Sequence, residues 1–424
     1  MFALLLAAIL MLPAVLAAQN TFYLHDHDTV MFYGDSITEQ KFYTNFVDAF
    51  VAMRYPGLDV RFVNSAWGGE NAIGGNGGTA DERLRRDVIP YKPTVMTVML
   101  GMNDGGYRAF DQERFERYSN GMEHIVQVVK EAFPSLRITL IEPSPYDDVT
   151  QPPQFADGYN AVLVRYGAFV KQMGERGQMP VVDMNGPVVD VLRKAYAANP
   201  EVARTLIPGR IHPSPAIHLV MAEALLKGWG AGPTVSTVAI DAGSKQIKEA
   251  VNTEISGLTV NRSISWTQKD AALPFPVNVH ARSLPIALRR GGAGTNLVLK
   301  VSDFIDALDQ QTLRVSGLPA AEYSLKINGQ SIGSYSREQL EKGINLAALT
   351  TPMSEQAAGV LNLVFQKTDI HTLRWRNIQM PFQNADIPRL SAIESDLDSL
   401  EAEIAARERA AAVPQACYYE LIPE

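Results

Sequence analysis

Between Asp28 and Pro233, short apolar runs alternate with longer amphipathic stretches, and this alternation constrains the fold more than any other feature. The runs are rich in β-branched and aromatic residues and stop at or next to Gly, Asn, Ser or Pro, as buried strands do. They cover 29–34, 59–65, 94–101, 137–143 and 179–184. The helical patterns between them cover 40–54, 111–132, 157–175, 186–198 and 215–230. Near-continuous apolar strands alternating with helices predict an α/β fold, a three-layer α/β/α sandwich with a five-stranded parallel sheet, within residues 18–233.

A different pattern follows Trp229. The chain beyond Pro233 is rich in Thr, Val, Ser and Gly, and segments such as LVLKV (297–301) and YSLKING (323–329) alternate with a period of two. Gly-Leu-Pro and Asn-Gly stretches in this region are typical of turns between short antiparallel strands. We therefore predict a β-rich accessory region over 234–385, with a helix near its end at 353–366.

The last segment, 386–424, is predicted to be an amphipathic helix followed by a tail. Its apolar residues recur at spacings of three and four, with Glu, Asp and Arg between them. They are Leu390, Ile393, Leu397, Leu400 and Ile404. About two heptads are too few to establish a coiled coil, so the pattern favours a helix docked on its own chain. A homodimer formed through this C-terminal helix is the alternative.

Charge and cysteine content exclude several classes of protein. The net charge is -8, with no block of clustered Lys and Arg, which argues against nucleic acid as a partner. Cys417 is the single cysteine, so neither an intramolecular disulfide nor a Cys-based zinc site can form. His25 and His27 are interpreted as solvated polar chain rather than metal ligands. No metal and no cofactor are predicted.

The N-terminus is apolar from Met1 to Ala18, and small residues at Val15 and Ala17 fit a cleavage site. We predict a signal peptide over 1–17, and the absence of disulfides favours a secreted or periplasmic bacterial protein. This run is too short to favour a stable membrane span, and no second apolar stretch reaches spanning length.

Four polar positions follow the predicted strands or precede the last helix of the first domain. Ser36 follows the first strand in GDS, Gly68 follows the second, Asn103 follows the third in GMND, and His212 precedes helix 215–230. Parallel strands bring their carboxyl ends to one edge of the sheet, where active sites of open α/β sheets gather. The first three residues are therefore expected to lie close together, and the loop that carries His212 can reach the same edge.

Together these positions provide the groups that acyl transfer needs. A serine hydroxyl becomes a good nucleophile when a base takes its proton, and His212 is the available base for Ser36. The negative oxygen formed on attack needs preset donors, which the amides of Ser36 and Gly68 and the side chain of Asn103 could supply. A serine that merely caps a helix is the alternative for Ser36 alone.

These four blocks, in this order, resemble those of the SGNH or GDSL-type hydrolases over roughly residues 28–232. The resemblance implies that Ser36 is the nucleophile, that Ser36, Gly68 and Asn103 form the oxyanion hole, and that His212 is the base. It also implies hydrolysis of esters, thioesters or amides of lipids, carbohydrates and small acyl compounds without a metal. Trp67, Tyr107 and Arg108 neighbour the expected oxyanion loops and are candidate substrate contacts, with ordinary packing as the alternative.

One block departs from the family pattern. Members of the family usually carry an aspartate three residues before the histidine, and Gly209 occupies that position here. Two hypotheses for orienting His212 remain open. A main-chain carbonyl near Gly209 or Arg210 could accept its Nδ1–H, or Asp147 or Asp148 from another loop could replace the missing acid.

The sequence thus predicts an exported serine esterase that hydrolyses carboxylic esters through an acyl-enzyme. The added β-rich region and the lack of a long apolar lid favour small-molecule or carbohydrate esters as substrates, by analogy with exported hydrolases. A lipid or thioester hydrolase is the first alternative. A non-catalytic carbohydrate-binding protein on a hydrolase scaffold is the second.

Overall fold

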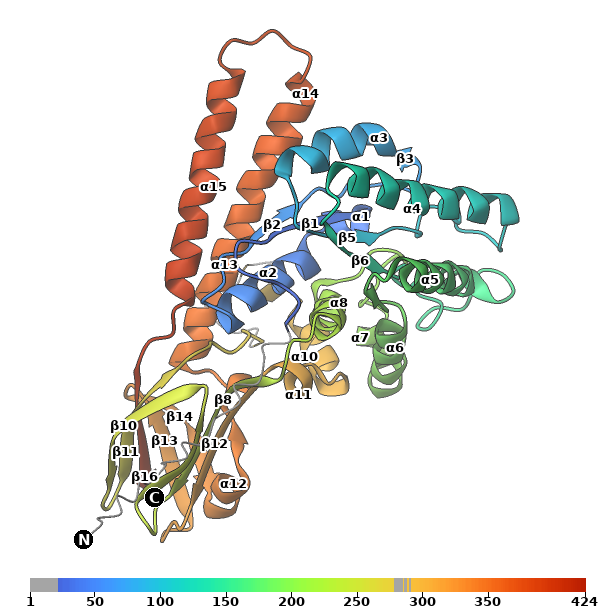
Figure 1. The fold of residues 1–424 in the computed structure, drawn as a ribbon. Coiled ribbons are helices and arrows are strands. Elements are labelled where there is room, and N and C mark those ends of the chain that lie inside the picture. The colour runs from blue at the N-terminus through green and yellow to red at the C-terminus, as the bar shows by residue number, and fades with distance from the viewer. Residues whose placement is uncertain (1–21, 278–284, 286–287, 290) are drawn as a thin grey trace, which may run out of the picture.

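A five-stranded parallel sheet forms the centre of the first half of the protein (Figure 1). The computed structural model describes residues 22–277, 285, 288–289 and 291–424, so the predicted signal peptide lies outside the described residues. The strands are β1 (Thr29–Gly34), β2 (Arg61–Asn64), β5 (Val95–Met99), β6 (Arg137–Ile141) and β7 (Val181–Val182). All neighbouring pairs in the order β2-β1-β5-β6-β7 are parallel, as predicted.

Helices cover both faces of this sheet, which confirms the predicted three-layer sandwich. One face is covered by α2 and α8, which pack on each other, and the other by α3, α4 and α5 (Figure 1). The main helices are α2 (Phe42–Arg54), α4 (Gln112–Ala132), α5 (Gly158–Gly177), α6 (Gly186–Ala198) and α8 (Pro215–Gly228). Shorter elements are α1 (Ser36–Glu39), α3 (Ala80–Arg83), η1 (Leu84–Val88), η2 (Ile89–Tyr91), α7 (Pro200–Ala203) and the β3–β4 pair (Gly74–Gly75, Gly78–Thr79).

The strand order determines where a site can form. From β1 the chain first adds β2 on one side and then β5 on the other, so the direction of winding reverses between β1 and β5. These two strands are neighbours, with Gly34 paired to Met99 at their carboxyl ends. Ligands of open α/β sheets bind in the crevice at such a switch point. The loops that carry Ser36 and Asn103 begin there.

The second half of the chain contains two further sheets, in agreement with the predicted β-rich character. One sheet has the order β15-β12-β8-β9 and the other β10-β11-β16-β13-β14. Their strands are β8 (Thr234–Asp241), β9 (Gln246–Val251), β10 (Thr253–Val260), β11 (Ile264–Asp270), β12 (Gln310–Ser316), β13 (Glu322–Ile327), β14 (Gln330–Ser336), β15 (Ile344–Asn345) and β16 (Cys417–Pro423). The predicted tail is therefore the central strand of the second sheet.

Two local predictions in this region were wrong. The LVLKV segment is not a strand but the second half of α10 (Gly292–Val301), because Thr295 and Val298 are buried on one helical face against α6, α7 and α8. Five alternating residues are too few to distinguish the two periods. β12 also does not pair with β13, since it adds to β8 in parallel and leaves β13 to the other sheet. The predicted Asn-Gly turn, Asn328-Gly329, does join β13 and β14.

A long helical hairpin rises from the β-rich part along the edge of the first domain (Figure 1). Its first arm is α13 (Pro352–Thr372), which confirms the helix predicted at 353–366, and it continues through the π-helical turn η4 (Leu373–Gln379) into α14 (Met380–Phe382). Its second arm is α15 (Leu390–Ala412). The predicted boundary at 385/386 falls between the two arms. The remaining short elements are α11 (Phe304–Leu308), α12 (Arg337–Lys342) and η3 (Leu346–Ala348).

The C-terminal helix α15 docks on its own chain, as favoured, but the packed face only overlaps the predicted stripe. The buried residues of α15 are Glu401, Ile404, Glu408 and Ala412, whereas Ile393 and Leu400 are exposed. A buried cation determines which face of α15 packs. Lys367 on α13 lies 2.6 Å from the carboxylate of Glu408 and 2.9 Å from that of Asp48 on α2. A buried charge needs a partner of opposite sign, so ion pairing overrides the apolar stripe.

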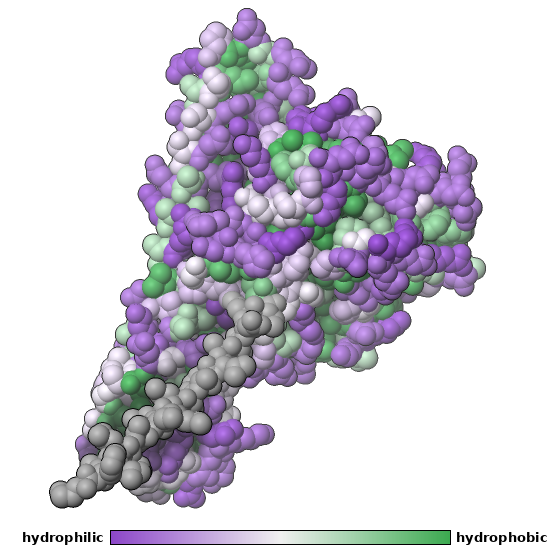
Figure 2. Space-filling view, viewed as in Figure 1, coloured by the Kyte–Doolittle hydropathy of each residue, from purple (hydrophilic) through white to green (hydrophobic). Residues whose placement is uncertain are grey.

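The tip of the hairpin is apolar. Hydrophobic atoms gather there in Figure 2, and Phe382, Ile387 and Ile393 in this part of the chain are each at least 40% exposed. The homodimer through the C-terminal helix stays a prediction. Among the described residues, no helix combines the length and the hydropathy that crossing a membrane requires.

Candidate active site

Ser36 is the first residue of α1, immediately beyond the end of β1. Asp35 caps this short helix by accepting the N–H of Ile37 at 2.9 Å. The turn is tight enough to need glycine at 34, since a Cβ there would lie 2.3 Å from Oγ1 of Thr38 and 3.0 Å from the carbonyl oxygen of Met99. Being the first helical residue, Ser36 has no intrahelical acceptor for its own N–H. Both its hydroxyl and its amide are therefore presented at the carboxyl edge of the sheet.

His212 meets Ser36 across this edge. Its Nε2 lies 2.9 Å from Oγ of Ser36, a hydrogen-bonding distance between groups 176 positions apart in the chain. His212 is exposed and Ser36 is half-buried, so the pair is open to solvent. The loop that carries the histidine is sharply bent, with left-handed φ values of 70° at Gly209 and 71° at Arg210. The predicted nucleophile and base are thus brought together.

A second histidine holds the loop of His212 in place. His218 is fully buried on α8; its Nδ1 accepts the N–H of Tyr43 at 3.3 Å, which leaves the proton on Nε2 for Oε1 of Gln40 at 3.2 Å. Gln40 in turn donates to the carbonyl of Pro213, next to His212, at 3.2 Å. Burial lowers the pKa of His218 to about 3, so its ring is neutral. These contacts give His218 a structural role.

Contacts between their loops connect the expected oxyanion donors. A Cβ added to Gly68 would lie 3.8 Å from Cβ of Ser36, so these two residues are neighbours. Asn103 donates one Nδ2 hydrogen to the carbonyl of Glu70 at 2.7 Å, while its Oδ1 accepts the hydroxyl of Tyr107 at 2.6 Å. This pairing fixes the orientation of the amide and leaves its second N–H for a ligand. These contacts are compatible with the predicted oxyanion hole of Ser36, Gly68 and Asn103.

The three candidate substrate contacts have different surroundings. Tyr107, with a left-handed φ of 57°, holds the amide of Asn103 and packs against Tyr146 and Tyr159. Trp67 lies in the turn before Gly68, and its ring is covered by the guanidinium group of Arg376. Arg108 is exposed and contacts the carbonyl of Gly106 within its own turn. Tyr107 and Trp67 therefore support the oxyanion loops, and Arg108 is free to meet a ligand.

Neither hypothesis for orienting His212 matches a contact in the structure. The carboxylate of Asp147 accepts two backbone N–H groups and a hydroxyl from residues 149 and 150. That of Asp148 accepts the N–H of Asn160 and pairs with Arg210 at 3.5 Å. The carbonyl of Arg210 accepts the N–H of Asp147. Among the described residues, the imidazole of His212 has Ser36 as its hydrogen-bond partner.

We expect Asp147→Asn and Asp148→Asn each to lower kcat for ester hydrolysis by less than about tenfold. Both carboxylates hold their own loop together, and removal of a true triad acid lowers kcat by about 10⁴. Steady-state kinetics of the two variants beside the wild type measure this. A loss on the larger scale in either variant would restore the acid hypothesis.

The buried carboxyl beside Ser36 is unusually basic. Burial raises the pKa of Asp35 to about 7 from 3.8, against the lowering effect of the Ile37 N–H, and the nearby carboxyl of Asp104 raises it further. The folded chain therefore binds more protons here than the unfolded chain. The resulting contribution to the free energy of unfolding is fully present below about pH 4 and is lost as pH rises through about 7.

We expect Asp35→Asn to be more stable than the wild type at pH 8 by up to about 4 kcal/mol, since one pKa unit corresponds to about 1.4 kcal/mol. At pH 4 the two proteins should be nearly equal, because the wild-type carboxyl is then neutral and the amide oxygen can still accept the Ile37 N–H. Urea unfolding at both pH values measures the difference. An equal difference at the two pH values would contradict this prediction.

Two parts of the site were not found from the sequence. Glu39 lies beside Gly68, with Oε2 2.7 Å from where a Cβ would stand, and its spacing of three from Ser36 on α1 was an available signal. Arg376 and Trp375 reach the same loop from the C-terminal hairpin, and no local pattern in the sequence indicates this. No cluster of three or more potential metal ligands occurs within the described residues.

Comparison with known proteins adds to this geometry. Residues 32–220 match the GDSL-like lipase/acylhydrolase family. An acetylxylan esterase of Geobacillus stearothermophilus is 28% identical over 223 residues, which cover 48% of this chain and 94% of the relative. A solved structure of a gut microbial diltiazem-metabolizing enzyme is 25% identical with a TM-score of 0.76, and the match covers 95% of this chain and 100% of that one. The second similarity therefore extends over the β-rich part and the hairpin.

Proposed function

Because the chain belongs to the GDSL-like lipase/acylhydrolase family through residues 32–220, we propose that it is a serine esterase working through an acyl-enzyme on Ser36. The observation that carries this proposal is the 2.9 Å contact between Oγ of Ser36 and Nε2 of His212. The position of Ser36 at the switch-point edge of the sheet, with Gly68 beside it, supports it further.

The geometry supports a two-step mechanism. Oγ of Ser36 attacks the ester carbonyl while Nε2 of His212 takes the hydroxyl proton. The carbonyl oxygen becomes negative and is stabilised by the amides of Ser36 and Gly68 and the free N–H of Asn103. The tetrahedral intermediate then breaks its bond to the alcohol, which receives the proton from His212. Water, deprotonated by the same histidine, attacks the acyl-enzyme and releases the acid and free Ser36.

The surroundings of the nucleophile support short acyl groups on a bulky alcohol, such as acetyl groups on carbohydrate. His212 is exposed, so the side of Ser36 that faces the imidazole is open to solvent. A cavity of about 740 Å³ lies instead between α2, β2 and the hairpin, and neither Ser36 nor His212 lines it. A long acyl chain needs an apolar channel beside the nucleophile. The acetylxylan esterase relative points to the same substrate class.

The first test combines turnover with labelling. Purified protein is incubated with p-nitrophenyl acetate and, separately, with a fluorophosphonate that reacts with activated serines. We expect turnover and a covalent adduct that maps to the peptide containing Ser36. A protein that does neither, yet retains binding to carbohydrate, would be the binding protein of the second alternative.

The second test determines the substrate. A series of p-nitrophenyl esters from acetate to palmitate is compared with acetylated xylan, and diltiazem is included because of the fold-wide structural neighbour. We expect kcat/KM to fall steeply beyond short acyl chains and acetate to be released from the polysaccharide. A maximum at long chains would favour the lipid hydrolase. The proposal of an exported protein is tested by the N-terminal sequence of the mature chain, expected to begin after Ala17.

A further inference from the structure

Arg376, on the π-helical turn η4 of the hairpin, contacts the loop that carries Gly68. Its Cζ lies 3.1 Å from the centroid of the Trp67 ring, directly before Gly68. Its Nη2 pairs with Oε1 of Glu39 at 2.8 Å, and the other oxygen of Glu39 faces Gly68. This guanidinium is 24% exposed, so solvent screens the ion pair only in part. The hairpin therefore covers the loop of one oxyanion donor with a stacked cation and an ion pair.

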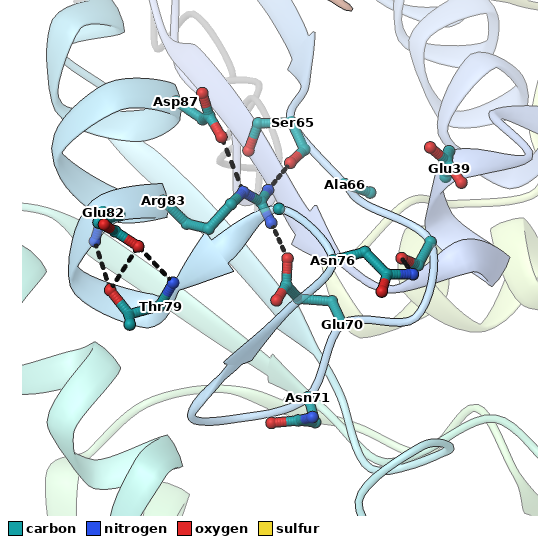
Figure 3. Close-up of polar contacts among 12 residues, drawn as sticks. Glu39, Ser65, Ala66, Glu70, Asn71, Asn76, Thr79, Glu82, Arg83 and Asp87 are labelled. Carbon is teal, nitrogen blue, oxygen red and sulfur yellow. Dashed lines mark hydrogen bonds and ion pairs between the residues drawn. The ribbon is translucent and has the colours of Figure 1, made fainter. Parts of the chain in front are cut away.

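Trp375 leads from the hairpin to the other oxyanion donor. Its Nε1–H donates to Oδ1 of Asp87 at 3.0 Å, and Oδ2 of Asp87 accepts Nε of Arg83 at 2.7 Å. Arg83 also pairs with the carboxylate of Glu70 and donates to the carbonyl of Ser65, as Figure 3 shows. The carbonyl of Glu70 accepts the amide of Asn103. A continuous set of polar contacts thus joins the hairpin to Asn103.

The physical properties of this network make it sensitive to its outer members. The side chains of Arg83, Glu70 and Asp87 are fully buried, so an unbalanced charge among them is costly. The supported loop is intrinsically loose, because six of the eleven residues from 68 to 78 are glycine. Trp375 and Asp87 both lie in π-helical turns, η4 and η1, and such turns occur frequently at functional sites.

We propose that Arg376 and Trp375 are positioning residues of the oxyanion hole, so that the C-terminal hairpin is part of the catalytic unit although it lies outside the family-matched residues. Arg376 holds the Trp67–Gly68 turn from outside, and Trp375 holds the Arg83 network that orients Asn103. This inference rests on the proposed function, because the oxyanion hole has a purpose only if Ser36 attacks a carbonyl.

The test measures kcat, KM and fluorophosphonate labelling rate on the full chain. We expect Arg376→Ala to lower kcat by about 10- to 100-fold, since small displacements of catalytic groups have effects of this size. Trp375→Phe, which keeps the ring and loses the donor, should lower kcat by about tenfold. KM should change less than about threefold in both, because the oxyanion exists only after attack. Labelling should slow in parallel, and Arg376→Lys should recover part of the loss.

Arg374→Ala is the matched control. Arg374 lies in the same π-helical turn but pairs across the hairpin with Asp398 at 3.0 Å and Glu394 at 3.9 Å, away from the oxyanion loop. We expect wild-type kcat for this variant and thermal unfolding within a few degrees of the wild type for all four. Wild-type kcat in Arg376→Ala would overturn the inference, as would equal losses of activity and stability in Arg376→Ala and Arg374→Ala. A wild-type chain without turnover or labelling would instead refute the proposed function, and the inference with it.

Discussion

Replacing Ser36 or His212 by alanine is expected to lower kcat for ester hydrolysis by about 10⁴ to 10⁶, the range found when members of such a unit are removed. In the proposed mechanism the two groups act in one proton transfer across 2.9 Å, so neither would work without the other. We expect the double variant Ser36→Ala, His212→Ala to be no slower than the slower single variant. Initial rates of p-nitrophenyl acetate hydrolysis, measured at high enzyme concentration, can detect losses of kcat of this size.

Ser214 offers a control on the same loop. Its hydroxyl is buried and has no hydrogen-bond partner among the described residues, so Ser214→Ala should keep the wild-type kcat. Fluorophosphonate labelling should disappear in Ser36→Ala and persist in Ser214→Ala. Removal of a nucleophile leaves far less than about 1% of the activity. If Ser36→Ala kept more than about 1% of wild-type activity, another group would have to attack the ester.

Replacing Asn103 by alanine is expected to lower kcat by about 10² to 10³, the effect of removing one oxyanion donor. The carbonyl of Glu70 accepts one N–H of Asn103 and the Asn103 oxygen accepts the Tyr107 hydroxyl, so the second N–H is the one available to the proposed oxyanion. KM should change little, because the ground-state ester gains little from this donor.

Two further variants separate donation from orientation. Asn103→Asp keeps an acceptor for the Tyr107 hydroxyl and loses both donors, so it should be as slow as alanine. Tyr107→Phe leaves the donors and frees the amide to rotate, so its loss should be smaller, about tenfold at most. A wild-type kcat in Asn103→Ala would remove this residue from the oxyanion hole.

Much of the first domain could be predicted because its signals are local. Strand β1 was predicted with its observed bounds, 29–34, and helix α6 with its bounds, 186–198. A fully buried strand must be apolar on both faces, and a helix that covers it must be apolar on one face. Each requirement produces its own pattern of apolar residues, which can be recognised within a short stretch of sequence. The contact between Ser36 and His212 could then be expected, since parallel strands place their carboxyl ends at one edge and the loop before helix α8 can reach that edge.

The C-terminal part was less predictable because its contacts are distant in sequence. The apolar stripe of α15 suggested that Ile393 and Leu400 would be buried, but Lys367 and Asp48 determine which face packs. In the same way, LVLKV has the period of a strand but forms the second half of helix α10, because partners from the first domain bury one face of that helix. The preference of five residues for one secondary structure is worth less free energy than the tertiary packing that opposes it.

The sequence alone determined which groups are available for catalysis: a hydroxyl after the first strand, an imidazole before the last helix, and a glycine and an asparagine between them. Only the tertiary structure decided what supports these groups. Gly209 cannot orient His212 as an aspartate would, and Trp375 and Arg376 act on residues near position 70 from some 300 positions away. The physical reason is that the periods of strands and helices arise from residues that are neighbours in sequence. Stacking, ion pairing and hydrogen bonding across the fold depend instead on which distant segments the folded chain brings into contact.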